Sequence, residues 1–194
     1  MKKITFIIIT TLVLFYSGNG HADEMDFRNT KWGMTMEEVI KSEGKEPTVA
    51  KNDNRVTYEY KGTIAGLDNS YAYRFIDNKL TSAAIIFTSS HTNKNDYIDD
   101  FQSVKEMLIH KYGKPENDVQ KWKNDLFRDH REGWGIAISV GDLEYIALWK
   151  MDRTDVFLQL TGENYEILFG ILYQSKQLKD LQEKESEKEI LDKL

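Results

Sequence analysis

The chain has 194 residues, no cysteine, and 32 acidic against 26 basic residues, which gives a formal net charge of −6. This length suits one domain or two small ones and suffices for a hydrophobic core without covalent cross-links. The lack of cysteine excludes disulfides and thiolate metal sites. The acidic balance disfavours nucleic acid and an anionic membrane surface as partners, because both carry negative charge.

The N-terminus has the pattern of a secretory signal peptide. Lys2 and Lys3 make a positive start, residues 4–16 form an apolar run, and the small residue Ala22 suits a cleavage site. The run is too short for a comfortable membrane span, and an uncleaved anchor is the alternative. We therefore expect residues 1–22 to be removed. The mature protein would be periplasmic or secreted, without stable membrane insertion after cleavage.

A short helix is predicted to begin after Thr35. Thr35 and Glu38 have the spacing of a capping box, in which each side chain accepts a hydrogen bond from the other residue's backbone N–H. Gly44 then supplies a left-handed residue that ends the helix, and Pro47 prevents the helix from resuming. The expected apolar face consists of Met36, Val39 and Ile40.

A longer helix is predicted from residue 96 to a stop at Gly113, which Pro115 follows. Asn95 or Asp96 can cap its N-terminus, where the helix dipole also favours acidic side chains. Its apolar residues recur at steps of four and three and form one stripe. The stripe consists of Tyr97, Phe101, Val104, Leu108 and Tyr112. Both helices therefore end in Gly-Lys with a proline just beyond.

After each helix stop the hydrophobic period changes to two, which is typical of strands. In the first half we predict a turn at Asp77-Asn78 and strands at residues 56–60, 71–75 and 80–87. In the second half we predict strands at residues 134–140, 143–151, 154–161 and 164–173. Two-residue turns would join them at residues 141–142, 152–153 and 162–163. Residues 116–133 leave a strand and a short helix open.

These elements predict an α+β fold built of two tandem helix-plus-antiparallel-sheet units. The first repeat would comprise residues 23–92 and the second residues 93–175. Residues 176–194 are dominated by lysine and glutamate and give no sustained heptad, so we expect a charged, solvated C-terminal helix. A partner-binding helix is the alternative for this tail.

The register of the second predicted sheet separates a core face from an opposite face. The core face would hold Trp134, Trp149 and Val156 among others, covered by the helix at residues 96–112. The middle of the opposite face is also apolar, which a solvated face would not require. Its apolar residues are Ile146, Leu148, Phe157, Leu168 and Leu172. We predict a binding surface formed by Ile146, Leu148, Phe157 and Leu168. Internal packing against the other repeat or the C-terminal segment is the alternative.

Several short motifs resemble known families. The first group is Phe27-Arg28, Trp32-Gly33-Met34-Thr35 and Glu38-Val39, and the second is residues 111–115, Trp149 and residues 171–173. Together they resemble a widespread class of uncharacterised bacterial exported proteins. The first helix with its glycine and proline is also similar to the SmpA/OmlA outer-membrane lipoprotein domain. That domain is related in fold to the beta-lactamase inhibitor protein (BLIP), a tandem of helix-plus-sheet repeats.

The resemblance implies a BLIP-like fold and a tendency to bind proteins, and it implies no catalytic residue. The chain departs from both named families, because it has neither the lipid-bearing cysteine of the lipoproteins nor the disulfides of the inhibitor.

No catalytic or metal-binding set is recognised in the sequence. The chain has no cysteine nucleophile, Gly-x-Ser-x-Gly motif or phosphate-binding glycine loop, and His91, His110 and His130 have no partner at metal-ligand spacing. We therefore predict a non-enzymatic protein without cofactor or metal. The predicted function is a protein-binding module of the cell envelope, with an assembly or inhibitor-like role and an envelope protein as partner. A small-molecule carrier with a site between the two repeats is the alternative, and a hydrolase ranks below both.

Overall fold

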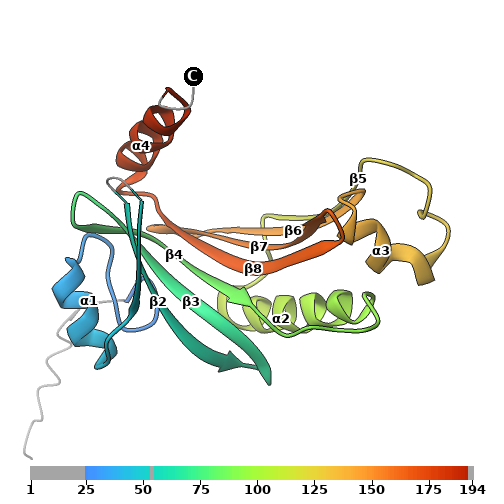
Figure 1. Ribbon diagram of the computed structural model, residues 1–194, viewed down its shortest axis with the longest axis horizontal. Helices are drawn as coiled ribbons and strands as arrows, with labels where there is room; N and C mark the ends of the chain where they lie inside the picture. The colour runs from blue at the N-terminus through green and yellow to red at the C-terminus, as the bar shows by residue number, and fades with distance from the viewer. Residues whose placement is uncertain (1–24, 53–54, 192–194) are drawn as a thin grey trace, which may run out of the picture.

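The computed structural model describes residues 25–52 and 55–191, so the predicted signal peptide lies outside the described residues. The fold is α+β, with one eight-stranded antiparallel sheet in the order β1-β2-β3-β4-β8-β7-β6-β5. Figure 1 shows α1 and α2 on the same side of this sheet, whereas α4 rises from the end of β8 on the other side.

The first half of the chain is one helix followed by four strands. These elements are α1 (Met36–Glu43), β1 (Thr48–Asn52), β2 (Arg55–Ile64), β3 (Leu67–Ile76) and β4 (Lys79–Phe87). The predicted capping box of α1 is present, since Thr35 and Glu38 each accept a hydrogen bond from the other's backbone N–H. The predicted turn at Asp77-Asn78 is also confirmed. Both residues have positive φ, 50° and 56°, as a tight hairpin between β3 and β4 requires.

The second half also places one helix before its strands. Its elements are α2 (Asp96–Tyr112), β5 (Asn117–Trp122), the 3-10 helix η1 (Arg131–Gly133), α3 (Trp134–Ser139), β6 (Leu143–Lys150), β7 (Thr154–Glu163), β8 (Glu166–Ser175) and α4 (Lys179–Leu191). The last strands of the two halves, β4 and β8, pair with each other, with Ile85 opposite Ile171. This pairing joins both halves into a single sheet.

One face of the sheet carries the core. Alternate residues of β2, β3, β4, β6, β7 and β8 are buried there beneath α1 and α2, with Val39 and Phe101 among the fully buried side chains of the two helices. Aromatic pairs extend across the junction of the halves, where the rings of Phe87 and Phe169 stack with centroids 4.3 Å apart. The apolar stripes of both helices therefore face the core, as their spacing predicts.

The segment before α1 also connects the two halves. The Phe27 ring lies between Tyr73 of β3 and Tyr173 of β8, with centroids 5.4 and 4.9 Å away. Trp32 Nε1 donates a hydrogen bond to Thr154 Oγ1 at 2.8 Å. The buried Asp26 carboxylate accepts from Arg153 Nη2, also at 2.8 Å. The chain thus begins, in its described part, by packing against the second half.

The predicted strand at residues 134–140 is wrong, because residues 134–139 form the helix α3. The predicted hairpin turn at residues 141–142 accordingly links a helix to β6. A short apolar run does not distinguish a strand from a buried helix by its period alone. The start of α3 packs closely against the chain just before α2. A Cβ atom on Gly135 would lie 2.3 Å from the Lys94 carbonyl carbon, so only glycine allows this approach.

The predicted turn at residues 162–163 is also wrong. The β7–β8 turn lies two residues later, at Asn164 and Tyr165, which have positive φ of 51° and 68°. Gly162 belongs to β7, and a Cβ atom there would lie 2.5 Å from the carbonyl oxygen of Ile138. This glycine therefore serves the close packing of α3 on the strand rather than a turn.

Two further details differ from the predictions, and one open segment is now assigned. Gly44 is left-handed as predicted, but Gly113, for which the same conformation was expected, adopts φ 81° and ψ −169°, which is outside the left-handed helical region. Asn95 precedes α2 without a side-chain cap, and its Oδ1 accepts instead from the Gly135 N–H at 2.6 Å. Residues 116–133 contain β5 and η1, and Leu126 lies in a turn between them.

Candidate functional site

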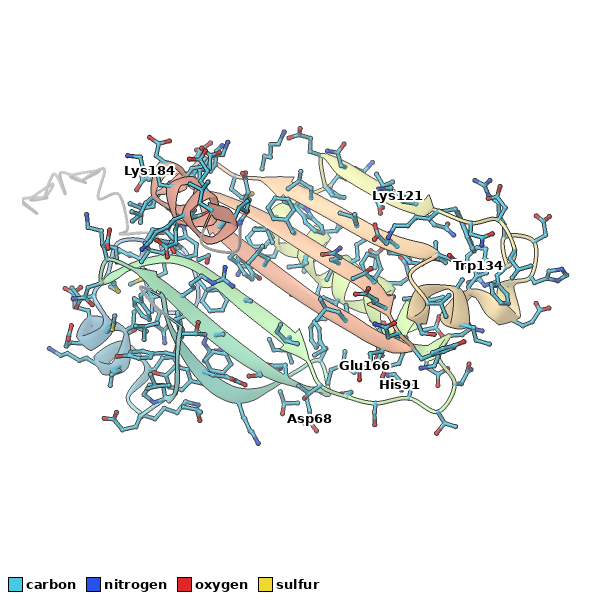
Figure 2. All side chains as sticks on the ribbon, turned by 45° about the horizontal axis from the view of Figure 1, so that its top comes forward. Asp68, His91, Lys121, Trp134, Glu166 and Lys184 are labelled. Atoms are coloured by element: carbon cyan, nitrogen blue, oxygen red, sulfur yellow. The ribbon has the colours of Figure 1, made fainter. Side chains whose placement is uncertain are left out.

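The face of the sheet opposite α1 and α2 is the surface on which the binding residues were predicted. Figure 2 looks onto this face, with α2 behind the sheet and Lys121 marking the outer strand β5. Among the described residues no helix crosses the middle of the face. Helix α4 approaches only its margin, where Gln182 Nε2 donates to the Thr81 carbonyl oxygen at 2.7 Å.

The strand register places an unbroken apolar row across the middle of this face. Leu148 lies opposite Phe157, Phe157 opposite Leu172, Leu172 opposite Ala84, and Ala84 opposite Ala72. All five side chains are half-buried. We call them the apolar row. Directly opposed side chains on one face of an antiparallel sheet are about 5 Å apart at Cβ, so the row is continuous.

A second, broken row runs beside the first. It starts with Val119 and Ile146, continues through Gln159 and Gly170, and ends at Ile86. Val119 is 46% exposed and Ile86 39% exposed. Apolar side chains are therefore sparser in this second row, which lies on the α3 side of the apolar row.

The four predicted site residues do not all meet. Ile146, Leu148 and Phe157 come together, but Leu168 lies opposite Thr161 near the start of β8 and is 49% exposed. Leu168 is four residues from Leu172, which is about 13 Å along a strand. Leu172 takes the place beside Phe157. The wrong position of the predicted β7–β8 turn explains this error. It shifts the predicted pairing of β8 along β7, but the same residues still share a face.

Lysine and glutamate side chains form ion pairs at the border of the apolar row. Lys123 Nζ lies 2.9 Å from a Glu144 carboxylate oxygen, and Lys150 Nζ lies 2.7 Å from one of Glu116. The hydrogen bond from Lys123 lowers the pKa of Glu144, so this carboxylate is firmly ionised at neutral pH. The border thus has alternating charge rather than a surplus of one sign.

A buried carboxylate lies on the other face, at the end of α1. The Glu43 side chain is 3% exposed and accepts hydrogen bonds from Tyr71 Oη at 3.0 Å, from Arg28 Nε at 3.2 Å and from Tyr73 Oη. Burial by itself raises the pKa of Glu43, but these donors outweigh burial and hold the pKa below its usual value. Burial raises the pKa of Tyr60 nearby to about 12. The cluster packs α1 onto the sheet.

The histidines lie apart from both features. His91 Nε2 is 2.6 Å from an Asp100 oxygen at the start of α2, and His130 lies in the exposed loop before η1. Within residues 25–52 and 55–191, no three His, Cys, Asp or Glu side chains group in a way that could hold a metal ion. The helices in the described part of the chain are all too short or too polar to cross a membrane.

The chain matches no known family model, no curated protein and no solved structure. The resemblance to exported proteins and to the SmpA/OmlA and BLIP folds therefore stays a prediction from its short motifs.

Proposed function

We propose that the chain is an exported, non-catalytic protein-binding module whose apolar row docks a partner protein of the cell envelope. The observation that carries the proposal is the uncovered row itself. Leu148, Phe157 and Leu172 occupy the centre of a sheet face that no helix of the described chain crosses. Half-buried leucine and phenylalanine side chains gain free energy when a partner removes the rest of their surface from water.

The chemistry of the face favours a protein over other partners. An apolar centre with a polar border is the usual anatomy of a protein interface. The border pairs Lys123 with Glu144 and Lys150 with Glu116, so it lacks the cation surplus that an anionic membrane or nucleic acid would require. The row crosses five strands, which is about 19 Å at the usual strand spacing. We expect a partner segment with an apolar stripe of that length and a polar edge.

The element order supports a tandem origin like that of the BLIP repeats. Each half begins with a helix, α1 or α2, and ends with a strand, β4 or β8, that pairs with its counterpart. In this proposal the repeats would make a broad platform, and the charged tail beyond β8 would stay solvated. Export rests on the pattern of residues 1–22. Intact-mass measurement of envelope protein tests it, and a mass that retains residues 1–22 would contradict it.

Phe157→Glu tests the docking surface. Because Phe157 is only half-buried, a glutamate there can reach water, and we expect the free energy of unfolding to change by less than about 1 kcal/mol. Partner binding should weaken at least tenfold, as for a central hot spot. Urea denaturation measures stability, and pull-down with quantified binding of the recovered partner measures affinity. Leu172→Glu should behave in the same way.

Leu126→Glu is the matched control, because Leu126 is 68% exposed and lies in the turn after β5, away from the row. It should keep both stability and partner. If Phe157→Glu instead loses several kcal/mol, the face is internal core. If it keeps stability and partner alike, the row is ordinary surface.

A further inference from the structure

The eight-stranded sheet ends at β5, and the outer edge of this strand has no neighbour in the described part of the chain. Figure 2 shows β5 along the upper margin of the sheet, where no other described segment runs beside it. Residues 117–121 are all exposed. An edge of this kind presents unpaired backbone N–H and C=O groups to any strand that approaches. It is an interaction surface separate from the apolar row.

The backbone groups that face outward belong to the even-numbered residues of β5. The Lys123 N–H donates to the Asp142 carbonyl oxygen at 2.8 Å, in the same register as the β5–β6 pairs. Hydrogen-bonded and non-hydrogen-bonded pairs alternate in an antiparallel ladder, so the odd-numbered residues of β5 bond with β6. The N–H and C=O groups of Asp118, Gln120 and Trp122 therefore point away from the sheet and are open to a second strand.

This edge has little protection against pairing. Natural sheets block their edges with proline, bulges, covering segments or charge. β5 contains no proline, its register with β6 is unbroken, and it carries one acid and one base. Both charges have partners nearby, since Lys105 Nζ lies 2.9 Å from an Asp118 carboxylate oxygen and Lys121 lies opposite Glu144. At the middle of the strand is an apolar residue, Val119, which is 46% exposed.

The sequence of β5 is complementary to a second copy of itself. Two antiparallel edges continue one sheet around a two-fold axis perpendicular to it, and side chains of the two copies that lie opposite each other share a face. With the axis at Val119, this residue lies opposite its own copy. Asp118 then lies opposite Gln120 of the second copy, and Asn117 lies opposite Lys121. No like charges are opposed, so the pairing has no electrostatic cost of that kind.

This register also covers the exposed valine. Val119 lies opposite Ile146 of β6, on the face that carries the apolar row. The two copies of Val119 would form a non-hydrogen-bonded pair, the kind in which opposed side chains are closest. Ile146 and Val119 of both copies would then make a continuous apolar row across the junction. The second copy thus removes from water the apolar side chain that a single copy exposes.

We infer that the protein forms a two-fold symmetric dimer in which β5 pairs antiparallel with β5 of a second copy, with Val119 at the axis. Asp118 and Gln120 of the two copies exchange their outward N–H and C=O hydrogen bonds. The contact extends about 20 Å along the strand, which is small for a protein interface, so the dimer dissociates on dilution. The axis leaves the apolar rows of both copies on one side of the joined sheet and free to bind.

A single cysteine reports on this pairing, because the chain has none of its own. The Cα atoms of the two copies of residue 119 would be about 4.5 Å apart, within disulfide range, while copies of residue 120 would be diagonal neighbours at about 7–8 Å. We expect Val119→Cys to form a disulfide-linked dimer on mild oxidation, at least about tenfold faster than Gln120→Cys. Non-reducing electrophoresis measures both rates. Faster linkage of Gln120→Cys would overturn the inference.

Analytical ultracentrifugation of the mature protein, from about 1 to about 300 µM, should show its mass rise toward twice that of one chain. Gln120→Pro removes an outward N–H that the β5–β6 ladder does not use, and it should weaken the dimer at least about tenfold. Gln120→Ala is the matched control, because it keeps the N–H and should dimerise like the wild type. Val119→Lys opposes two cations at the axis and should also weaken the dimer, while circular dichroism checks that each variant folds.

The inference is overturned if the wild type stays monomeric throughout this range, or if Gln120→Pro and Val119→Lys fold and leave the dimer intact. Phe157→Glu should dimerise like the wild type, so the dimer and the docking surface can fail separately. A dimer that Phe157→Glu dissociates would use the apolar row instead of β5. In cells, a photo-crosslinking residue in place of Val119 should give an adduct of two chains. An adduct with another protein alone would assign the edge to a foreign strand and overturn the inference.

Discussion

At the scale of single residues, Glu43 is a buried and strongly hydrogen-bonded polar group of the first half. Its carboxylate is buried, yet it receives three side-chain donors, from Tyr73, Tyr71 and Arg28. Arg28 also lies over the Tyr71 ring, 4.1 Å from its centre. A buried charge is tolerated only when it is paired and hydrogen-bonded, and the cluster meets that condition. The end of α1 is therefore held to β3 by an ionised acid.

This arrangement predicts a pH-dependent contribution to stability. The pKa of Glu43 is lower in the folded than in the unfolded chain, where it is about 4.3. Its stabilisation is therefore complete above about pH 4.3 and is lost as the pH falls through the folded pKa. Glu43→Gln should lower the free energy of unfolding by about 2 kcal/mol at pH 7. Urea denaturation from pH 3 to pH 7 should show this difference shrinking toward acid.

Glu46→Gln is the control for this comparison, since Glu46 is exposed just beyond the same helix. It should stay close to the wild type at neutral pH. A Glu43→Gln variant whose deficit is constant from pH 3 to pH 7 would show that the carboxylate's charge is not what stabilises the end of α1.

At the scale of elements, the two helix stops share a sequence pattern but differ in backbone conformation. Gly44 is in the left-handed helical region at φ 68° and ψ 15°, whereas Gly113 adopts φ 81° and ψ −169°. The first region is open to other residues at a modest cost, while the second is essentially restricted to glycine. Residues 114–116 connect Gly113 to β5, and the Gly113 carbonyl accepts from Trp149 Nε1 at 2.8 Å.

Alanine substitutions at the two glycines should therefore lower the free energy of unfolding by different amounts. Gly44→Ala should cost about 1 kcal/mol, and Gly113→Ala about 1–3 kcal/mol. A Cβ atom at either position meets nothing within 4 Å, so the cost comes from the backbone and not from a clash. Thermal or urea unfolding of both variants measures it. Equal or reversed costs would contradict the conformational difference between the two stops.

At the scale of the whole molecule, the two halves share one sheet and one core. The β4–β8 pairing, the stacked Phe87 and Phe169 rings and the Trp32–Thr154 hydrogen bond all cross the junction. Contacts of this kind couple the halves in unfolding, because β4 and β8 would each become an unpaired edge strand if the other half were lost. The molecule should therefore unfold in a single transition.

Val39→Ala tests this coupling from the first half. Val39 is fully buried in α1, and its truncation should cost about 2 kcal/mol. Three of the four tryptophans lie in the second half, so tryptophan fluorescence reports mainly on that half. Fluorescence and far-UV circular dichroism should shift to lower urea together. Val104→Ala in α2 is the corresponding variant in the second half. A fluorescence midpoint that Val39→Ala leaves unchanged would show that the two halves unfold independently.

The amino-acid sequence by itself determined the features that depend on neighbours along the chain. The capping box of Thr35 and Glu38, the stripe of α2, the Asp77-Asn78 turn and the alternation of β6, β7 and β8 all follow from contacts within a few residues. The assignment of Ile146, Leu148 and Phe157 to one face belongs to this group, since a strand's period of two survives an error in the turn.

Tertiary structure decided what depends on residues far apart. The sequence pattern predicts a strand at Gly135 and a turn at Gly162. In the structure each position requires glycine, because another segment passes within 3 Å of where its Cβ would be. In the folded chain residues 134–139 form α3, the β7–β8 turn lies at Asn164 and Tyr165, and Leu172 rather than Leu168 lies beside Phe157. The β4–β8 pairing has the same origin. Local pattern carries no information about which distant backbone will approach, so only the folded chain reveals these features.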